Sequence, residues 1–314
     1  MKHSWKITLI LIGMFVLAQL IGLLVINAYS SSTQELEING TIQNITIQKQ
    51  LPYGMQPPEI KPELSIISIA ISMVIAIFLI FILMRFKAKF FIKLWFFIVV
   101  ILALGLAINS LLMYFTSYSA YIAIVIALPL AIFKIYRRNM LVHNLTELLI
   151  YPGIAAVFVP ILSQLTAIIL LVAISIYDVW AVWHSGFMQK MAKYHINKLN
   201  IFPGFFLPNV DKKTKLKIQL LRQKYKNKIP EKVAKKSKLK INLAILGGGD
   251  VVFPIIFSGV VLLARGLIPA LLITIFASIA LFLLFIFARK GKFYPAMPFL
   301  TAGCLLGFLI GLLF

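Results

Sequence analysis

Two aspartates lie within stretches of the chain whose other side chains are mostly apolar. Only 9 of the 314 residues are acidic, and seven of them fall in expected loops or at the ends of apolar segments. The remaining two are Asp178 and Asp250. A carboxylate near the centre of a membrane helix costs about 2.5–3.5 kcal/mol on insertion scales, so acids in such places are candidates for function.

A pair of neighbouring carboxyl groups in a low dielectric favours one specific chemistry. Both groups do not ionise readily together, so the pair shares one proton. Such a pair can take a proton from water while it protonates a carbonyl oxygen, as aspartic proteases do. Intramembrane acids also occur in pumps and transporters. On the two aspartates alone, an aspartic protease and a proton- or cation-conducting transporter or channel are both open.

The composition is that of a membrane protein. Hydrophobic residues make up 61% and charged residues 13% of the chain, and the mean hydropathy is +0.98, whereas soluble domains have about 45–50% and 25%. A net charge of +22 would suggest nucleic acid in a soluble chain, but nucleic-acid binding does not require apolar runs of about twenty residues. The single Cys304 rules out an intrachain disulfide and a cysteine-based metal site.

Apolar runs long enough to cross about 30 Å of hydrocarbon predict nine membrane spans. Six are clear: 7–26, 64–84, 94–114, 162–183, 243–264 and 267–288. Three are less regular: 118–136, 295–314, and 145–160, which is broken by Pro152, Gly153 and Pro160. The first run is longer than the usual 7–15 apolar residues of a signal peptide, which favours an uncleaved anchor. We expect an all-α polytopic membrane protein.

The basic residues predict the orientation of these spans. Short cytoplasmic loops collect Lys and Arg. With a cytoplasmic amino terminus, 28 of the 31 basic residues fall on the inner side, sixteen of them between 190 and 240. The outer loop 27–63 instead carries four glutamates. The carboxyl terminus is then expected outside.

The same orientation places the two aspartates at one depth. Asp178 lies six residues before His184 and Asp250 lies ten residues after Lys240, at the expected inner ends of their spans. At about 1.5 Å per residue both lie roughly 9–15 Å from the inner surface. The two helices run in opposite directions, so neighbouring packing would bring the carboxyl groups together.

Three glycines, Gly247, Gly248 and Gly249, precede Asp250. Each costs about 1 kcal/mol in a helix relative to alanine, so the run weakens the start of the span and leaves room for close backbone approach. A substrate strand could lie there. Small residues also serve helix packing in membranes, and a packing role for the glycines is the alternative.

These residues resemble one family. Tyr177-Asp178 on the sixth span and Gly247-Gly248-Gly249-Asp250, as a G-x-G-D motif on the seventh, are similar to the presenilin and signal peptide peptidase family of intramembrane aspartic proteases. The resemblance covers the whole chain in topology. It implies that Asp178 and Asp250 form the catalytic dyad, with Tyr177 beside it. An interfacial or packing tyrosine is the alternative for Tyr177.

The third motif of the family, Pro-Ala-Leu, has two candidates here. A literal copy opens the eighth span at 269–271, on the expected outer side, away from the aspartates. Pro295, Ala296 and Met297 open the ninth span from the inner side, at the depth of the aspartates. We assign the motif to Pro295, Ala296 and Met297, where a methionine replaces the leucine. Proline lacks an amide donor, which leaves backbone groups available to an extended substrate.

Other protease chemistries lack their motifs. The sequence has no H-E-x-x-H, and its four histidines show no metal-ligand spacing. It also has no G-x-S-x-G. We therefore expect no metal and no organic cofactor. A prepilin-type peptidase also uses a G-x-G-D aspartate, but nine spans with Tyr177-Asp178 suit the presenilin-like group better.

The inner loop 184–242 is strongly basic. Apolar residues at near-helical spacing between its lysines predict a basic helix on anionic lipid rather than a nucleic-acid site. Just before Gly247, the residues Leu239, Ile241, Leu243 and Ile245 alternate with period two. The resemblance suggests a strand that pairs with the substrate, although the start of an apolar helix would show the same pattern.

We divide the chain into a six-helix half, 1–183, the basic loop, 184–242, and a three-helix half, 243–314. The expected function is hydrolysis of peptide bonds within transmembrane segments or remnant signal peptides, by Asp178, Asp250 and water. The expected location is the cell membrane. Single-span proteins are the expected substrates, with anionic lipid at 190–240 and without nucleic acid or an obligatory protein partner.

Overall fold

The computed structural model contains a bundle of long helices with two small sheets. It describes residues 5–30, 32–38, 41–47, 51–55, 89–137, 139–185, 203–209, 242–288 and 294–314, with isolated residues between 67 and 86 and at 220. The α-helices in these ranges are α1 (Trp5–Ala28), α3 (Lys89–Leu112), α4 (Ser119–Tyr136), α5 (Met140–Phe158), α6 (Gln164–Trp180), α10 (Gly248–Arg265), α11 (Leu267–Phe287) and α12 (Met297–Gly311). A 3₁₀ turn (Val159–Ile161) follows α5, and a π-helical turn (Ala181–Ser185) follows α6.

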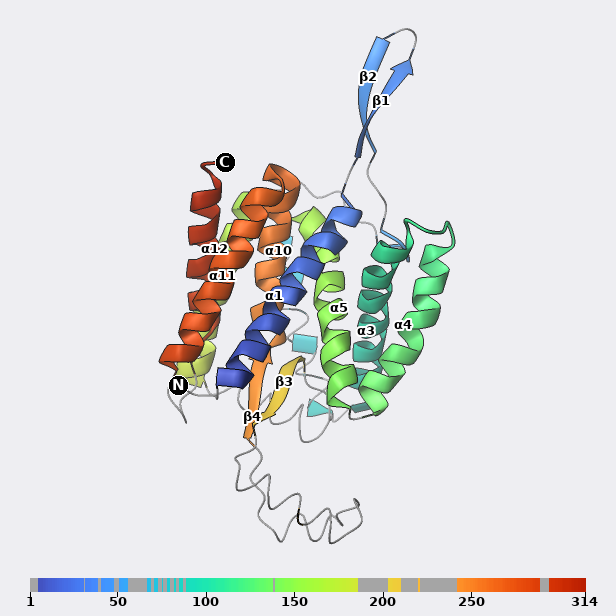
Figure 1. Cartoon of the computed structure of the whole chain (residues 1–314). Coiled ribbons are helices and arrows are strands. Elements are labelled where there is room, and N and C mark those ends of the chain that lie inside the picture. Colours follow the sequence, from blue (N-terminus) through green and yellow to red (C-terminus); the bar gives the residue numbers. More distant parts are fainter. Residues whose placement is uncertain are drawn as a thin grey trace.

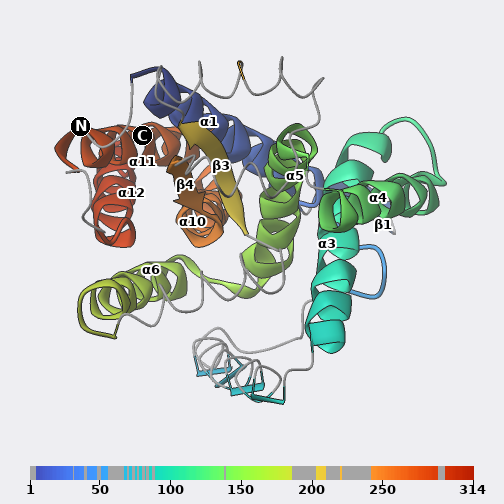
Figure 2. The same cartoon turned by 90° about the horizontal axis from the view of Figure 1, so that it is seen from below.

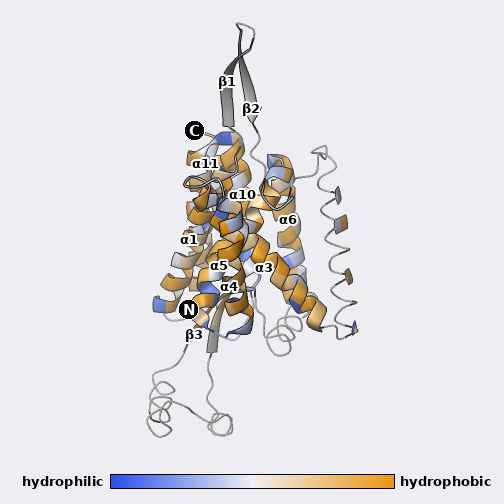
Figure 3. Cartoon of the chain, turned by 90° about the vertical axis from the view of Figure 1, so that its right-hand side faces the viewer, coloured by the Kyte–Doolittle hydropathy of each residue, from blue (hydrophilic) through white to orange (hydrophobic). Residues whose placement is uncertain are grey.

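Most of these helices can cross a bilayer. Among the described residues, seven helices are long and apolar enough to do so, and α12 is a shorter apolar helix of 15 residues. Figure 3 shows apolar residues along much of their length. Large side chains such as Trp95, Tyr121 and Leu165 are more than half exposed, as expected for a surface that faces lipid. The predicted span 64–84 lies mostly outside the described residues.

The chain ends lie at opposite ends of the bundle (Figure 1). An odd number of spans has this property. Which end faces the cytoplasm stays a prediction.

Three helices form the centre of the bundle. α1 packs against both α5 and α10, and α5 also contacts α10 (Figure 1). A side chain at Gly22 would overlap Ile255, and one at Gly259 would overlap Ile26, so these glycines let α1 and α10 approach closely. The buried amide of Gln19 adds a polar contact, because its Nε2 donates to the carbonyl oxygen of Val251 at 3.1 Å.

The fifth predicted span differs from the expectation of a short, broken segment. α5 begins at Met140, where Asn139 caps it by accepting from the backbone N–H of Leu141 at 2.9 Å. It continues through Pro152 and ends only at the 3₁₀ turn that contains Pro160. At Gly153 a side chain would overlap the carbonyl group of Ala103. The glycine thus serves close packing of α5 against α3 and does not end the helix.

The expectation of an all-helical chain is wrong in two places. β1 (Ser32–Ile38) and β2 (Thr41–Ile47) pair antiparallel within the predicted outer loop. β3 (Gly204–Asn209) and β4 (Asn242–Gly247) pair antiparallel at the opposite end of the bundle (Figure 1). β4 occupies the first residues of the predicted span 243–264, so α10 begins only at Gly248. The alternating residues of β4 bury Ala244 and Leu246 and expose Ile245.

Candidate active site

Asp178 joins the end of α6 to the start of α12. Its side chain is 7% exposed. Its Oδ2 accepts a hydrogen bond from the backbone N–H of Met297 at 3.1 Å, and the backbone of Ala296 also donates to this carboxyl group. Because a helix N-terminus presents unpaired N–H groups, it stabilises a carboxylate placed there. The start of α12 is therefore built to hold Asp178.

Asp250 lies in the first turn of α10, directly after β4. Its carboxyl group accepts a hydrogen bond from the backbone of Gly247 and interacts electrostatically with Asp178. The side chain is partly exposed. The structure thus places Asp178 of α6 and Asp250 of α10 near enough to interact electrostatically, with Asp178 held by backbone groups of α12 and Asp250 held by its own helix start.

The three glycines before Asp250 have different surroundings. A Cβ at Gly247 would lie 3.0 Å from Oδ2 of Asp250, and a Cβ at Gly248 would lie 3.0 Å from the ring and hydroxyl of Tyr151. At Gly249 the closest atom would be on Phe253 at 3.5 Å, an ordinary contact. Steric room is therefore required at the first two glycines, while Gly249 is exposed.

The two copies of the proline motif lie at opposite ends of α12. Pro295 is buried, Ala296 is the cap of α12, and Met297 is 3% exposed beside Asp178. The literal copy begins at Pro269 in α11, which contacts Gly311 at the far end of α12. The 15 residues of α12 separate these ends by about 22 Å. Only the segment at 295–297 reaches the aspartates.

Tyr177 is not brought into this group. Its side chain is 42% exposed, and its ring lies 6.3 Å from that of Trp180 on the same helix. These contacts agree with the packing or interfacial alternative.

The register of the β3–β4 pair fixes which backbone groups remain outside it. The N–H and C=O of Phe206 both bond to the side chain of Asn144, so they point away from β4. Phe206 lies opposite Ile245. In an antiparallel pair the two residues of such a position both direct their backbone groups outward. The N–H and C=O of Ile245 therefore point away from β3, along the other edge of the sheet.

Sequence reasoning missed two polar features among the described residues. Ser175 Oγ and Thr301 Oγ1 lie 2.6 Å apart and join α6 to α12 about one turn from Asp178 and from Met297. Their spacing of three and four residues from those positions was a usable signal.

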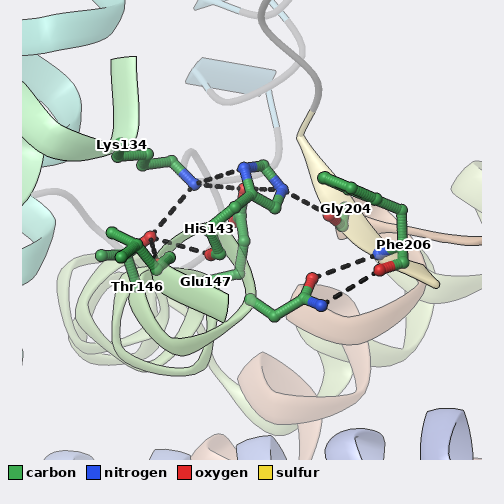
Figure 4. Close-up of polar contacts among 8 residues, drawn as sticks. Lys134, His143, Thr146, Glu147, Gly204 and Phe206 are labelled. Carbon is green, nitrogen blue, oxygen red and sulfur yellow. Dashed lines mark hydrogen bonds and ion pairs between the residues drawn. The ribbon is translucent and has the colours of Figure 1, made fainter. Parts of the chain in front are cut away.

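The second missed feature is the group around Glu147, which was expected at the edge of a span. Glu147 is 2% exposed and is paired with Lys134 (Figure 4). The usable signal in the sequence was the spacing of His143 and Glu147, which lie one helical turn apart at the end of an apolar segment.

In the described part of the chain, no three His, Cys, Asp or Glu side chains gather as a metal site would require.

Comparisons with known proteins bear on the family and the fold. The family model described as signal-peptide peptidase, presenilin aspartyl protease matches residues 12–314. The fold is similar to a presenilin family intramembrane aspartate protease solved in space group C222, with a TM-score of 0.61, 19% identity and 98% of each chain covered. A structure of such a protease in space group P2 gives 0.57, 19% and 96% of each chain. No curated protein matches the chain.

Proposed function

Because the chain belongs to the signal-peptide peptidase and presenilin family of aspartyl proteases, we propose that it cleaves peptide bonds within transmembrane segments or remnant signal peptides of other membrane proteins. It would be an intramembrane aspartic endopeptidase of the G-x-G-D type. The observation that carries the proposal is the electrostatic interaction between Asp178, held at the start of α12, and Asp250 in the first turn of α10. The family match and the apolar helices make the chain an integral membrane protein.

The proposed reaction uses the two carboxyl groups with one shared proton. The ionised carboxyl takes a proton from a water molecule, whose oxygen attacks the scissile carbonyl carbon. The protonated carboxyl donates its proton to the carbonyl oxygen, which gives a tetrahedral diol. When the C–N bond breaks, the dyad gives its proton to the leaving nitrogen and takes one from a diol hydroxyl as the C=O bond re-forms, so the two carboxyl groups again share one proton. The Met297 N–H stabilises the charged form of Asp178.

The substrate segment is proposed to bind as a strand. A helical segment keeps its carbonyl groups in its own hydrogen bonds, so it must unwind before cleavage. Within the described residues β4 pairs only with β3, so the outward backbone groups of Ile245 offer its other edge to such a segment. β4 runs directly into Gly247 and Asp250, so a strand added there would bring a peptide bond to the dyad.

The remaining expectations belong to the same proposal. We place the chain in the cell membrane, crossing it nine times from a cytoplasmic amino terminus, with single-span proteins as substrates. The basic loop 190–240 would bind anionic lipid, and no obligatory protein partner is proposed.

Reconstitution tests the proposal against the transporter alternative. The purified chain and its Asp178→Asn variant are placed in liposomes, with and without a single-span substrate. We expect defined peptide products from the wild type, none from the variant, and no proton or cation flux that depends on Asp178. Flux that the variant abolishes, without any peptide product from the wild type, would replace the protease by a transporter or channel.

A further inference from the structure

A buried polar cluster lies between α4 and α5, beside the β3–β4 pair. We define this cluster as Lys134, His143 and Glu147, which Figure 4 labels, together with Asn144, which bonds to Phe206. Nζ of Lys134 lies 2.6 Å from Oε1 of Glu147, and the two side chains are only 2% and 3% exposed. Nζ also contacts Nδ1 of His143 at 3.5 Å. The cluster therefore holds an ion pair inside the helix bundle.

Stability alone is a poor reason for such a pair. Removing two charges from water costs several kcal/mol per ion, and replacing a buried pair by apolar residues of similar volume is often neutral or stabilising. A buried pair that persists in an apolar bundle calls for another role. The contacts that the cluster makes outside α4 and α5 indicate what that role is.

Those contacts all reach β3. Nε2 of His143 lies 2.9 Å from the carbonyl oxygen of Gly204. With Nδ1 facing the Lys134 ammonium, Nε2 carries the proton and donates it to this oxygen. The Asn144 side chain donates to the C=O of Phe206 at 3.0 Å and accepts from its N–H at 3.2 Å. The ring of His143 also packs 4.7 Å from that of Phe206.

The cluster thereby occupies one edge of the sheet. Gly204 and Phe206 direct backbone groups to the same side of β3, and both are taken by α5 side chains. A substrate strand is left with the other edge, along β4. An unoccupied β3 edge would compete for the substrate, but it lies one strand farther from the dyad.

The cluster also fixes the strand that leads to Asp250. β3 pairs with β4 over its full length, from Gly204 opposite Gly247 to Asn209 opposite Asn242. The N–H of Gly248 bonds to the carbonyl oxygen of Pro203 at 3.3 Å. A shift of β3 therefore passes directly to the first residues of α10.

We infer that the cluster of Lys134, His143, Asn144 and Glu147 is a positioning device for proteolysis. It closes the β3 edge and holds β4 in register, so that a substrate strand pairs only with β4 and presents one peptide bond to the dyad. The inference rests on the proposed protease function. These residues act through β3 and β4 and are not catalytic.

The test separates positioning from stability. The double variant Lys134→Met/Glu147→Leu removes both charges at similar volume, and Asn144→Leu removes both hydrogen bonds to Phe206. In liposomes with a single-span substrate, we expect each variant to cleave at least about tenfold more slowly, in line with the effect of a misplacement of about 1 Å. We also expect products cut at additional positions, identified by mass spectrometry, while the melting temperature of the double variant stays at or above the wild-type value.

One control and one further cluster variant complete the test. Ser110→Ala removes a buried hydroxyl that bonds only within α3, to Ala107 at 2.7 Å, and should keep the wild-type rate and cleavage positions. His143→Phe keeps an aromatic ring but loses the bond to Gly204. It replaces a cluster variant that does not fold, with the same expected loss of rate and the same additional cleavage positions.

Wild-type rates with unchanged cleavage positions in the folded variants would overturn the inference. Slower cleavage that merely follows a loss of stability, with unchanged cleavage positions, would also overturn the inference. If the wild type cleaves and Asp178→Asn does not, either result overturns the role of the cluster and leaves the proposed protease function standing. If the wild type does not cleave, the proposed function fails first.

Discussion

Gly248 gives a prediction whose size can be worked out from the structure. A Cβ at this position would lie 3.0 Å from Cε1 and Oη of Tyr151 and 3.3 Å from Cζ. Carbon atoms in favourable contact are about 3.5–4.0 Å apart. The Cβ of Gly248→Ala would therefore lie about 0.5–1 Å too close to Tyr151. Tyr151 has little freedom to move, because it is 2% exposed and its ring packs edge-on against Phe205 at 5.4 Å.

The backbone of α10 must therefore give way. Asp250 is two residues further along the same first turn, so its carboxyl group moves by a comparable amount. A displacement of up to about 1 Å can cost about a hundredfold in rate, and we expect kcat to fall by about 10- to 100-fold with a smaller change in KM. Overpacking costs about 1–3 kcal/mol, and alanine returns up to about 1 kcal/mol through helix propensity. The net loss of stability is thus at most about 3 kcal/mol.

The assay is cleavage of a single-span substrate in liposomes, with the thermal unfolding of each variant measured alongside. Gly13→Ala is the matched control, because a Cβ at Gly13 in α1 meets no atom within 4 Å. It should keep the wild-type rate and gain a little stability. A Gly248→Ala variant with the wild-type kcat would refute the steric reasoning.

Two further predictions concern how the helices hold the site. Ser175→Ala, Thr301→Val and the double variant remove the hydroxyl–hydroxyl contact between these residues and should lower the cleavage rate by a few fold. A double-mutant cycle of unfolding should give a coupling free energy of about 0.6 kcal/mol. Additive effects of the two single changes would contradict the contact. Gly22→Val should destabilise the protein by about 1–3 kcal/mol in thermal unfolding, because the new side chain would overlap the fully buried Ile255 of α10. Gly13→Val is the control, because a Cβ at Gly13 meets no atom within 4 Å. Equal effects of the two variants would contradict the close packing of α1 on α10.

The two candidate aspartates could be proposed from the sequence because acids are so scarce in it. With only 9 acidic residues, each could be assigned to a side of the membrane, and Asp178 and Asp250 remained. The choice of the motif at Pro295 over the one at Pro269 followed from the same assignment of sides. The family resemblance noted from these motifs is confirmed by the family match over residues 12–314.

The strands and the polar cluster could not be predicted with the same security. β3 and β4 are separated by more than thirty residues, and the sequence of neither strand indicates which segment it pairs with. Period-two spacing in an apolar segment fits a strand as well as the start of a buried helix, and only the pairing with β3 distinguishes them. Glu147 lies near an expected end of a span, and the sequence does not indicate that Lys134 is its partner. Their pairing depends on how α4 packs against α5, which is a property of the folded chain.

The central claim is that Asp178 and Asp250 act as one catalytic unit. The most direct measurement is the single-turnover cleavage rate of a single-span substrate by equal amounts of the wild type, Asp178→Asn, Asp250→Asn and the double variant in liposomes. Groups that act as a unit are strongly non-additive. We expect each single variant to lose as much rate as the double variant does, with all three folded. A single variant that retains the wild-type rate, or a double variant whose loss is the product of the two single losses, would contradict the claim.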